Sequence, residues 1–196
     1  MRPNWAQDPP PASIEVGGYA YPVQTDFRVW LDVLGLLRQI DRDAQTEDEK
    51  AENARVYLQI EQLVFGGHLD EEAPEDVLRG VTEFLAGYPS APVQSSAKAS
   101  ARTFSYDYDL NEILMAIRDQ HGVDLSWRNK DGCHWWEFLL YFHTLAGDHV
   151  ILNLMDVRGY DGKDKEMLKR KRQYALPEEL TKEDKAEQDA LRALFG

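Results

Sequence analysis

The residues best suited to chemistry are three histidines in the second half of the chain, His134, His143 and His149, with Glu137 and Asp148 among them. Imidazoles and carboxylates bind zinc, and zinc sites on helices use two histidines four residues apart with a nearby carboxylate. His134 and His143 are nine residues apart and fall on opposite faces of a helix, whereas His134 and Glu137 share a face. A metal-dependent enzyme using His134, Glu137 and Asp148 stays an alternative, but the spacing favours polar positions beside a hydrophobic core.

Two acidic side chains, Asp107 and Asp109, come directly before an apolar helical pattern. Paired carboxylates can act as general acid and base. Carboxylates at this place also accept hydrogen bonds from the first amides of a helix, and the pattern favours this second interpretation. Arg158 follows a purely apolar segment, and we expect its guanidinium to form a bidentate ion pair with Asp107 or Asp109.

Other catalytic signatures are absent from the sequence. The glycine pairs at 17–18 and 66–67 lack the Lys-Ser/Thr of a phosphate-binding loop, and no Gly-x-Ser-x-Gly motif is present. Cys133 is the single cysteine, so no intrachain disulfide is expected. A lone thiol beside an aromatic run is more often a small buried hydrophobe than a nucleophile. We therefore expect a protein that is not an enzyme and needs no cofactor.

Composition limits the partners that the chain can bind. Its 196 residues include 35 acidic and 22 basic side chains, a net charge of −13. Such a surface is repelled by nucleic-acid phosphates and anionic lipid. No apolar run reaches the roughly 18 residues of a membrane span, and the first residues do not follow the pattern of a secretion signal. We expect an intracellular protein that binds neither nucleic acid nor membrane.

One basic run, from Lys169 to Arg172, departs from this acidic character. Glu166 and two aspartates are interspersed near it, which favours a solvated helix face. If this run binds a partner, we expect an acidic surface, such as the N-terminal half of this protein.

The element expected to organise the C-terminal half is an aromatic-rich segment that begins near residue 133. Its apolar residues recur at helical spacing on one face: Trp135, Phe138, Leu139 and Phe142. Trp136 and Leu140 lie off that face, so we expect a helix buried on nearly all sides. A second apolar stripe follows at Val150, Ile151, Leu154 and Val157, and the two helices together form the predicted hub.

The chain divides into four expected segments: a mobile Pro-rich arm at 1–13, a unit at 14–88, a flexible linker at 89–103 and a C-terminal helical unit at 104–196, where Thr181 begins a last helix. The first unit combines a hairpin, turning at 17–18, with three helices. Thr25, a Thr46–Glu49 capping box and Pro74 mark their starts. The first of these helices is apolar on two sides and needs partners on both. The predicted fold class is mainly α, with an N-terminal β-hairpin plus two small helical units joined by a flexible linker.

Several of these motifs together resemble the phage gp-fifteen family of tailed phages. They are Tyr106-Asp107-Tyr108-Asp109 before a helix that ends in Gly122-Val123-Asp124-Leu125, then His134-Trp135-Trp136-Glu137-Phe138, Ile151 to Arg158, and Lys171 to Pro177. The resemblance singles out six signature positions, which we interpret as structural, with partner contact as the alternative: Asp107, Asp109, Trp135, Trp136, Phe138 and Arg158.

The resemblance also implies a function. Genes of this family lie beside the tail tape-measure gene, and their products are regarded as tail assembly chaperones. Such a protein would coat the long, helical, aggregation-prone tape-measure protein until tube subunits polymerise around it. It would act in the cytoplasm of the infected bacterial host and be absent from the finished virion of a siphovirus. The expected partners are the tape-measure protein, the tail tube protein and a second copy of the chain.

Overall fold

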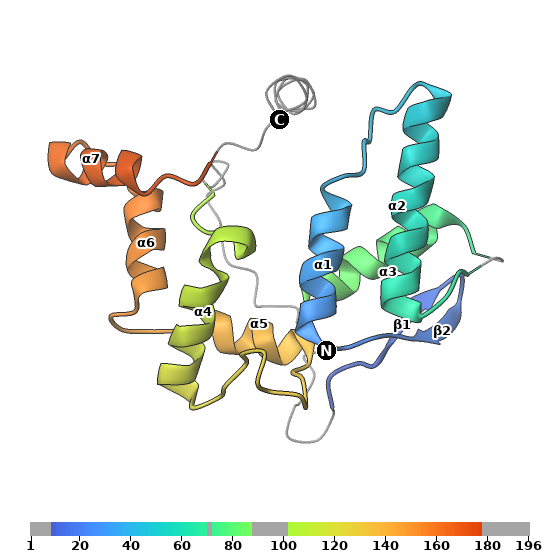
Figure 1. The fold of residues 1–196 in the computed structure, drawn as a ribbon, viewed down its shortest axis with the longest axis horizontal. Helices are drawn as coiled ribbons and strands as arrows, with labels where there is room; N and C mark the ends of the chain where they lie inside the picture. Colours follow the sequence, from blue (N-terminus) through green and yellow to red (C-terminus); the bar gives the residue numbers. More distant parts are fainter. Residues whose placement is uncertain (1–8, 70–71, 88–101, 178–196) are drawn as a thin grey trace, which may run out of the picture. The chain divides into compact units, whose positions relative to one another are not determined.

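The computed structural model describes residues 9–69, 72–87 and 102–177 (Figure 1). Within these ranges the chain is mainly helical and carries one antiparallel hairpin at its N-terminal end, which confirms the predicted fold class to that extent. By its contacts the chain divides into two units, one of residues 1–96 and 112–147, the other of residues 97–111 and 148–196.

The first unit begins with the hairpin, whose strands are β1 (Ser13–Val16) and β2 (Tyr19–Pro22). Gly17 and Gly18 both adopt positive φ angles at its turn, as a two-residue connection requires. The same unit contains α1 (Phe27–Leu37), α2 (Glu47–Phe65), α3 (Pro74–Ala86) and α5 (Trp135–His143). Helix α4 (Tyr106–His121) starts in the second unit and ends in the first, and α6 (Val150–Gly159) and α7 (Lys165–Gln173) belong to the second.

Local signals set most helix ends as predicted. The capping box of Thr46 and Glu49 is formed, the left-handed residue Gly66 ends α2, and Pro74 lies in the first turn of α3. The expected cap of α1 is wrong by one residue. Asp26 is the N-cap, because its carboxylate accepts a hydrogen bond from the Arg28 amide at 2.9 Å.

The core of the first unit is built from aromatic rings on α1, α3 and α5. Phe27 stacks on Phe138 with 4.7 Å between ring centroids, and Trp30 stacks on Phe84 at 4.4 Å. Helix α5 therefore packs with helices of the N-terminal half. Elsewhere in this unit, the contact of α3 with β1 needs a glycine, since a Cβ at Gly80 would collide with the Ile14 side chain.

The predicted hub is corrected in two respects. Its two helices fall in different units, α5 in the first and α6 in the second. The predicted apolar face of α5 is buried, but Trp136 is only half-buried and Leu140 is 44% exposed. Because α5 turns one face toward the aromatic core, it is a one-sided helix and not one buried all round.

Several predictions fall on residues outside those described. Most of the arm at 1–13, most of the linker at 89–103 and the helix expected from Thr181 lie there. The proposed boundaries and the flexibility of the linker stay predictions, although the observed grouping of α5 with the N-terminal helices differs from them.

Candidate functional site

His134 is the N-cap of α5, and its ring is fully engaged by backbone groups. Its Nδ1 accepts a hydrogen bond from the Trp136 amide at 3.0 Å, and its Nε2 lies 2.8 Å from the carbonyl oxygen of Pro11. Because an amide donates and a carbonyl accepts, this arrangement requires a neutral ring with its proton on Nε2. Neither nitrogen then offers a lone pair to a metal.

The metal-dependent alternative gains no support from the rest of its residues. Glu137 follows in the first turn of α5, while Asp148 belongs to the other unit and accepts a hydrogen bond from Asn153 at 2.7 Å. Among the residues that the structure describes, no group of three histidine, cysteine or acidic side chains could hold a metal ion.

The starts of α1 and α5 are joined by an isolated antiparallel bridge between Asp26 and His134. The Phe27 amide donates to the Cys133 carbonyl at 2.9 Å, and the Trp135 amide donates to the Thr25 carbonyl at 2.7 Å. The two N-caps are thus direct neighbours. Each helix start satisfies amides of the other that no helical carbonyl reaches.

Cys133 lies in this bridge and is held as a neutral thiol. Burial, together with the negative charges of Glu137 and Asp26, raises its pKa to about 12. The thiolate is the nucleophilic form of cysteine, so this thiol is unreactive near neutral pH.

The two adjacent tryptophans tie α5 to the end of α3. The indole N–H of Trp135 donates to the Leu85 carbonyl at 3.1 Å, and that of Trp136 donates to the Phe84 carbonyl at 2.9 Å. The last carbonyls of a helix have no partner within it. Here the Leu85 carbonyl accepts from the Trp135 indole, while the Phe84 carbonyl accepts both from the Trp136 indole and from the Gly87 amide at 3.0 Å. This contact explains why two neighbouring positions both carry an indole.

Three of the signature positions, Trp135, Trp136 and Phe138, therefore stabilise the first unit. Trp135 and Phe138 are buried and stack on each other with 5.6 Å between ring centroids, while Trp136 keeps part of its surface exposed. The structure places these rings in the core or at its edge. A direct contact of Trp136 with a partner stays a prediction.

The second unit is organised by a buried ion pair. Arg158 donates from its two terminal nitrogens to the two carboxylate oxygens of Asp109 at 2.7 and 3.0 Å, and both residues are less than a tenth exposed. The predicted bidentate pair is confirmed, with Asp109 as the partner. The guanidinium also donates to the carbonyls of Thr103 at 3.1 Å and Tyr174 at 2.8 Å. One side chain thus joins the start of α4, the end of α6 and the residue after α7.

Asp107 has a different role from Asp109. Its carboxylate accepts a hydrogen bond from the Ser105 hydroxyl at 3.3 Å and is exposed. Asp109 instead accepts from the Ser105 amide at 2.9 Å while it binds Arg158. The capping interpretation is confirmed for Asp109, which accepts from the amide directly before α4. The Asp107 carboxylate accepts from the Ser105 hydroxyl, which itself accepts from the Asp107 amide at 3.3 Å, and only Asp109 binds the arginine.

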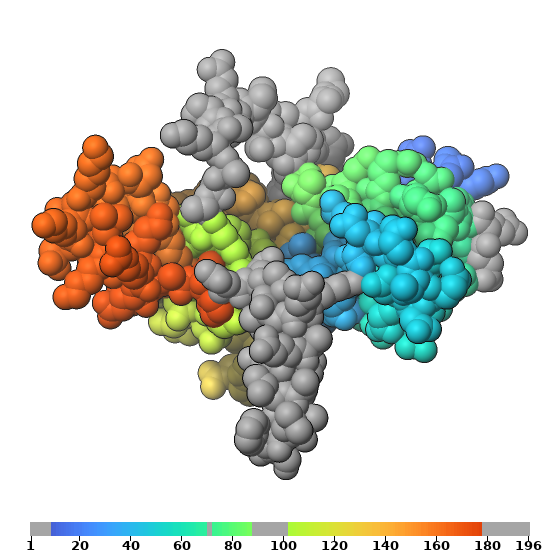
Figure 2. Space-filling model, turned by 90° about the horizontal axis from the view of Figure 1, so that it is seen from above, coloured from blue at the N-terminus to red at the C-terminus, as the bar shows by residue number. Residues whose placement is uncertain are grey.

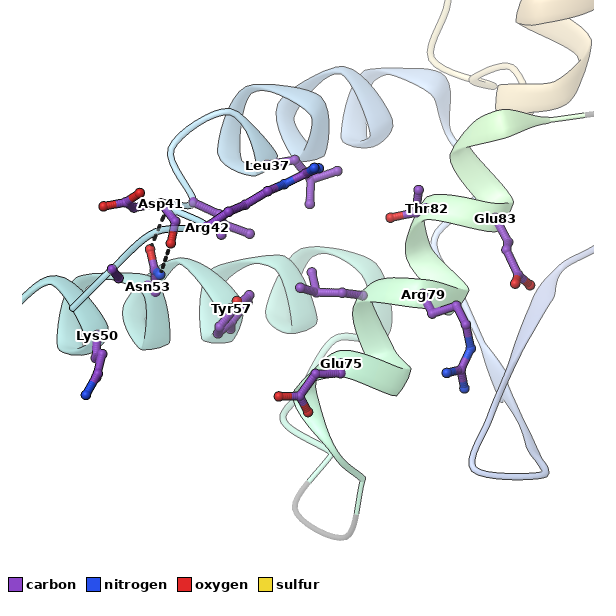
Figure 3. Close-up of a pocket in the computed structure, with 13 residues that line it drawn as sticks. Leu37, Asp41, Arg42, Lys50, Asn53, Tyr57, Glu75, Arg79, Thr82 and Glu83 are labelled. Carbon is purple, nitrogen blue, oxygen red and sulfur yellow. Dashed lines mark hydrogen bonds between the residues drawn. The ribbon is translucent and has the colours of Figure 1, made fainter. Parts of the chain in front are cut away.

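A groove lies between α1, α2 and α3 (Figure 3). It has a volume of about 750 Å³ and is open to solvent. Its apolar lining consists of Leu37, Ile40, Ala44, Tyr57 and Leu78. Its charged lining holds three acidic and three basic side chains: Asp41, Glu75, Glu83, Arg42, Lys50 and Arg79.

The loop that forms one wall of the groove is held in place by Asn53. Its side-chain amide donates to the Asp41 carbonyl at 2.7 Å, and its oxygen accepts from the Asp41 amide at 2.9 Å (Figure 3). The groove is therefore a preformed surface. The sequence indicated that the first helix is apolar on two sides, but not that its last residue, Leu37, and the loop after it would line a groove with α2 and α3.

Comparison with known proteins identifies one related family. A family model described as Bacteriophage Gp15 protein matches residues 7–179. The matched range includes the groove, both indoles and the Arg158–Asp109 pair. No curated protein and no solved structure matches the chain. In the described ranges, no helix has the length and apolar character needed to cross a bilayer.

Proposed function

The chain belongs to the bacteriophage Gp15 protein family, and from this premise we propose that it is a tail assembly chaperone that binds the tape-measure protein. Membership in the family indicates a phage structural or morphogenesis protein. In the finer proposal, the protein covers the tape-measure protein in the host cytoplasm, helps to recruit tail tube subunits and leaves before the virion is complete. It does so by binding, without a catalytic step.

The observation that carries the proposal is the groove between α1, α2 and α3. An amphipathic helix binds by laying its apolar face into a hydrophobic groove. The apolar lining of this groove would receive such a face, and the three acidic and three basic side chains around it would pair with charges of either sign. A long helical protein kept unassembled exposes many segments of this kind. The groove is formed by α1, α2 and α3 before any client is bound, which lowers the cost of binding.

The alternative proposal, a metal-dependent enzyme, has less in its favour. Both ring nitrogens of His134 are engaged by backbone groups, so a metal would have to break the N-cap of α5. Breaking such a cap costs about 0.5–2 kcal/mol. Zinc bound in a fixed ratio and lost on His134→Ala would restore this alternative.

The proposal is tested by co-expressing the chain with the tape-measure protein encoded beside it. We expect the tape-measure protein to become soluble and to co-purify with the chain. In the groove, Leu78→Glu should reduce the co-purified amount about tenfold, because it places a charge where an apolar face would dock. The matched control is Leu58→Glu on α2, since Leu58 is 47% exposed and does not line the groove.

Two outcomes would contradict the proposal. One is a tape-measure protein that stays insoluble beside the wild-type chain. The other is an equal effect of the two glutamate substitutions when both variants have the melting temperature of the wild type.

A further inference from the structure

Helix α7 differs from the rest of this acidic protein by its positive charge. It contains five basic residues and one acidic residue, and none of its residues is buried. Its atoms, orange to red in Figure 2, lie at the surface. Arg158 donates a hydrogen bond to the carbonyl of Tyr174, the residue after α7, but this contact involves none of the charged side chains of the helix.

Three of these cations form a stripe along one side of the helix. Lys165, Lys169 and Arg172 follow the spacing i, i+4 and i+7, which places them on one face. Each is exposed and forms no hydrogen bond or ion pair with a described residue. Lys171 lies away from this stripe and donates to the Tyr160 carbonyl at 2.7 Å. The stripe is available to a partner, whereas the opposite side serves the fold.

The chain also carries a surface of the opposite sign. The stretch from residue 41 to 52 has six acidic and two basic side chains. Glu47, Asp48 and Glu52 are exposed in the first turns of α2. Glu47 and Glu52 form ion pairs within the helix, with Lys50 and Arg55 at 3.0 Å. Exposed pairs of this kind contribute little, so they do not prevent a partner from binding.

We propose that the α7 stripe binds the acidic stretch at the start of α2 in a second copy of the chain. Because the two surfaces lie on different helices, two copies can pair reciprocally in a closed dimer, or each copy can offer its two surfaces to different neighbours and build a ring or an open array. A polyanion such as RNA is the less favourable partner, because the net charge of −13 repels phosphates.

The three acidic residues that the proposal uses, Glu47, Asp48 and Glu52, do not line the groove, although Asp41, Arg42 and Lys50 of the same stretch do. The driving force of the proposed contact is the attraction between exposed charges, which salt screens over a distance of about 10 Å at 0.1 M ionic strength. We therefore expect the average mass of the wild-type chain, measured by light scattering, to rise with protein concentration at low salt. Raising the salt to about 0.5 M should return it to the monomer mass.

A charge-exchange experiment tests the two surfaces directly. One variant carries Lys165→Glu, Lys169→Glu and Arg172→Glu, and the other carries Glu47→Lys, Asp48→Lys and Glu52→Lys. Each variant alone should stay monomeric, because both of its surfaces then have the same sign. The equimolar mixture should assemble, and a chain with all six substitutions should regain self-association. Circular dichroism verifies that the helices persist.

The control changes the same number of charges elsewhere. Arg118→Glu, Arg128→Glu and Lys130→Glu together alter exposed basic residues outside α7 and should leave self-association within about twofold of the wild type. Three results would overturn the proposal: a wild-type chain that is monomeric at every concentration, a mixture that does not assemble, or equal loss in the control. Binding of a labelled single-stranded RNA by the wild type, lost in the α7 variant without any change in mass, would assign the stripe to a polyanion instead.

Discussion

The two units use different side chains to satisfy the backbone groups at the ends of their helices. In the first, two indole N–H groups donate to carbonyls at the end of α3, and His134 caps the start of α5. Stacked rings pack α1 against α5. In the second, the start of α4, the end of α6 and the residue after α7 meet at one buried guanidinium. Both arrangements provide partners for backbone groups that a helix cannot satisfy itself.

The difference lies in how each arrangement responds to loss of a residue. In the first unit, several rings and hydrogen bonds together stabilise the contact of α5 with α1 and α3, so the loss of one side chain leaves the other contacts in place. The ionic centre of the second unit depends on both charges, because removing one leaves the other buried and unpaired. We therefore expect substitutions to have larger effects in the second unit.

The largest effect is expected for Arg158→Ala. It should lower the free energy of unfolding by about 3–5 kcal/mol, since it strands the buried Asp109 carboxylate. Denaturant unfolding followed by far-ultraviolet circular dichroism measures this loss. Arg118→Ala, at an exposed arginine of α4, is the control and should change stability by less than about 0.5 kcal/mol. A loss below about 1 kcal/mol for Arg158→Ala, which is the typical net contribution of one hydrogen bond, would contradict the central role of this arginine.

A smaller loss is expected for Trp136→Ala in the first unit. The ring is half-buried, and its removal should cost about 2 kcal/mol from lost apolar burial and the lost hydrogen bond to Phe84. Trp136→Phe keeps most of the ring and should cost about 1 kcal/mol. Equal losses for the two substitutions would assign the whole contribution to the N–H group.

The cap of α5 should contribute less again. His134→Ala removes the acceptor of the Trp136 amide and should cost about 1 kcal/mol, whereas His134→Asn keeps a cap and should cost less. The tryptophans among the described residues (Trp30, Trp127, Trp135 and Trp136) all belong to the first unit, so tryptophan fluorescence during urea unfolding reports on this loss. A larger cost for asparagine than for alanine would show that His134 does not act as a cap.

The smallest loss of stability is expected at alkaline pH. Burial raises the pKa of Cys133 in the first unit from 9.0 to about 12, and that of Tyr106 in the second from 10.0 to about 12. In both cases the folded chain keeps a proton that the unfolded chain releases, so stability falls as pH rises above the unfolded pKa.

The first unit should therefore begin to weaken at about pH 9 and the second at about pH 10. Urea midpoints measured by tryptophan fluorescence between pH 7 and pH 10, for the wild type and Cys133→Ala, test the first unit. The alanine variant should lose less stability over this range. A steeper loss of stability with pH in the alanine variant would contradict the prediction that Cys133 destabilises the first unit at alkaline pH.

The sequence predicted the features that depend on local spacing or on a specific pair of charges. The hairpin turn, the Thr46–Glu49 box, the buried stripe of α5 and the pairing of Arg158 with an aspartate at the start of α4 all belong to this group. Each follows from a periodicity, a cap or a charge complement that the residue types themselves display.

The features that the sequence did not predict depend on distant backbone. The partners of Trp135, Trp136 and His134 are carbonyls and amides, which every residue carries and which leave no mark in the residue types. For the same reason the sequence did not predict that α5 packs with α1 and α3, nor that the end of α1 and the loop after it form a groove with α2 and α3.

The most direct test of the proposed function places a photoreactive residue in the groove. Leu78 replaced by a photoreactive phenylalanine derivative, in cells that also make the tape-measure protein, should crosslink to that protein on illumination. The same replacement of Leu58, outside the groove, should not. Crosslinking from position 58 but not from position 78, or from neither, would contradict the assignment of this groove as the surface that shelters the tape-measure protein.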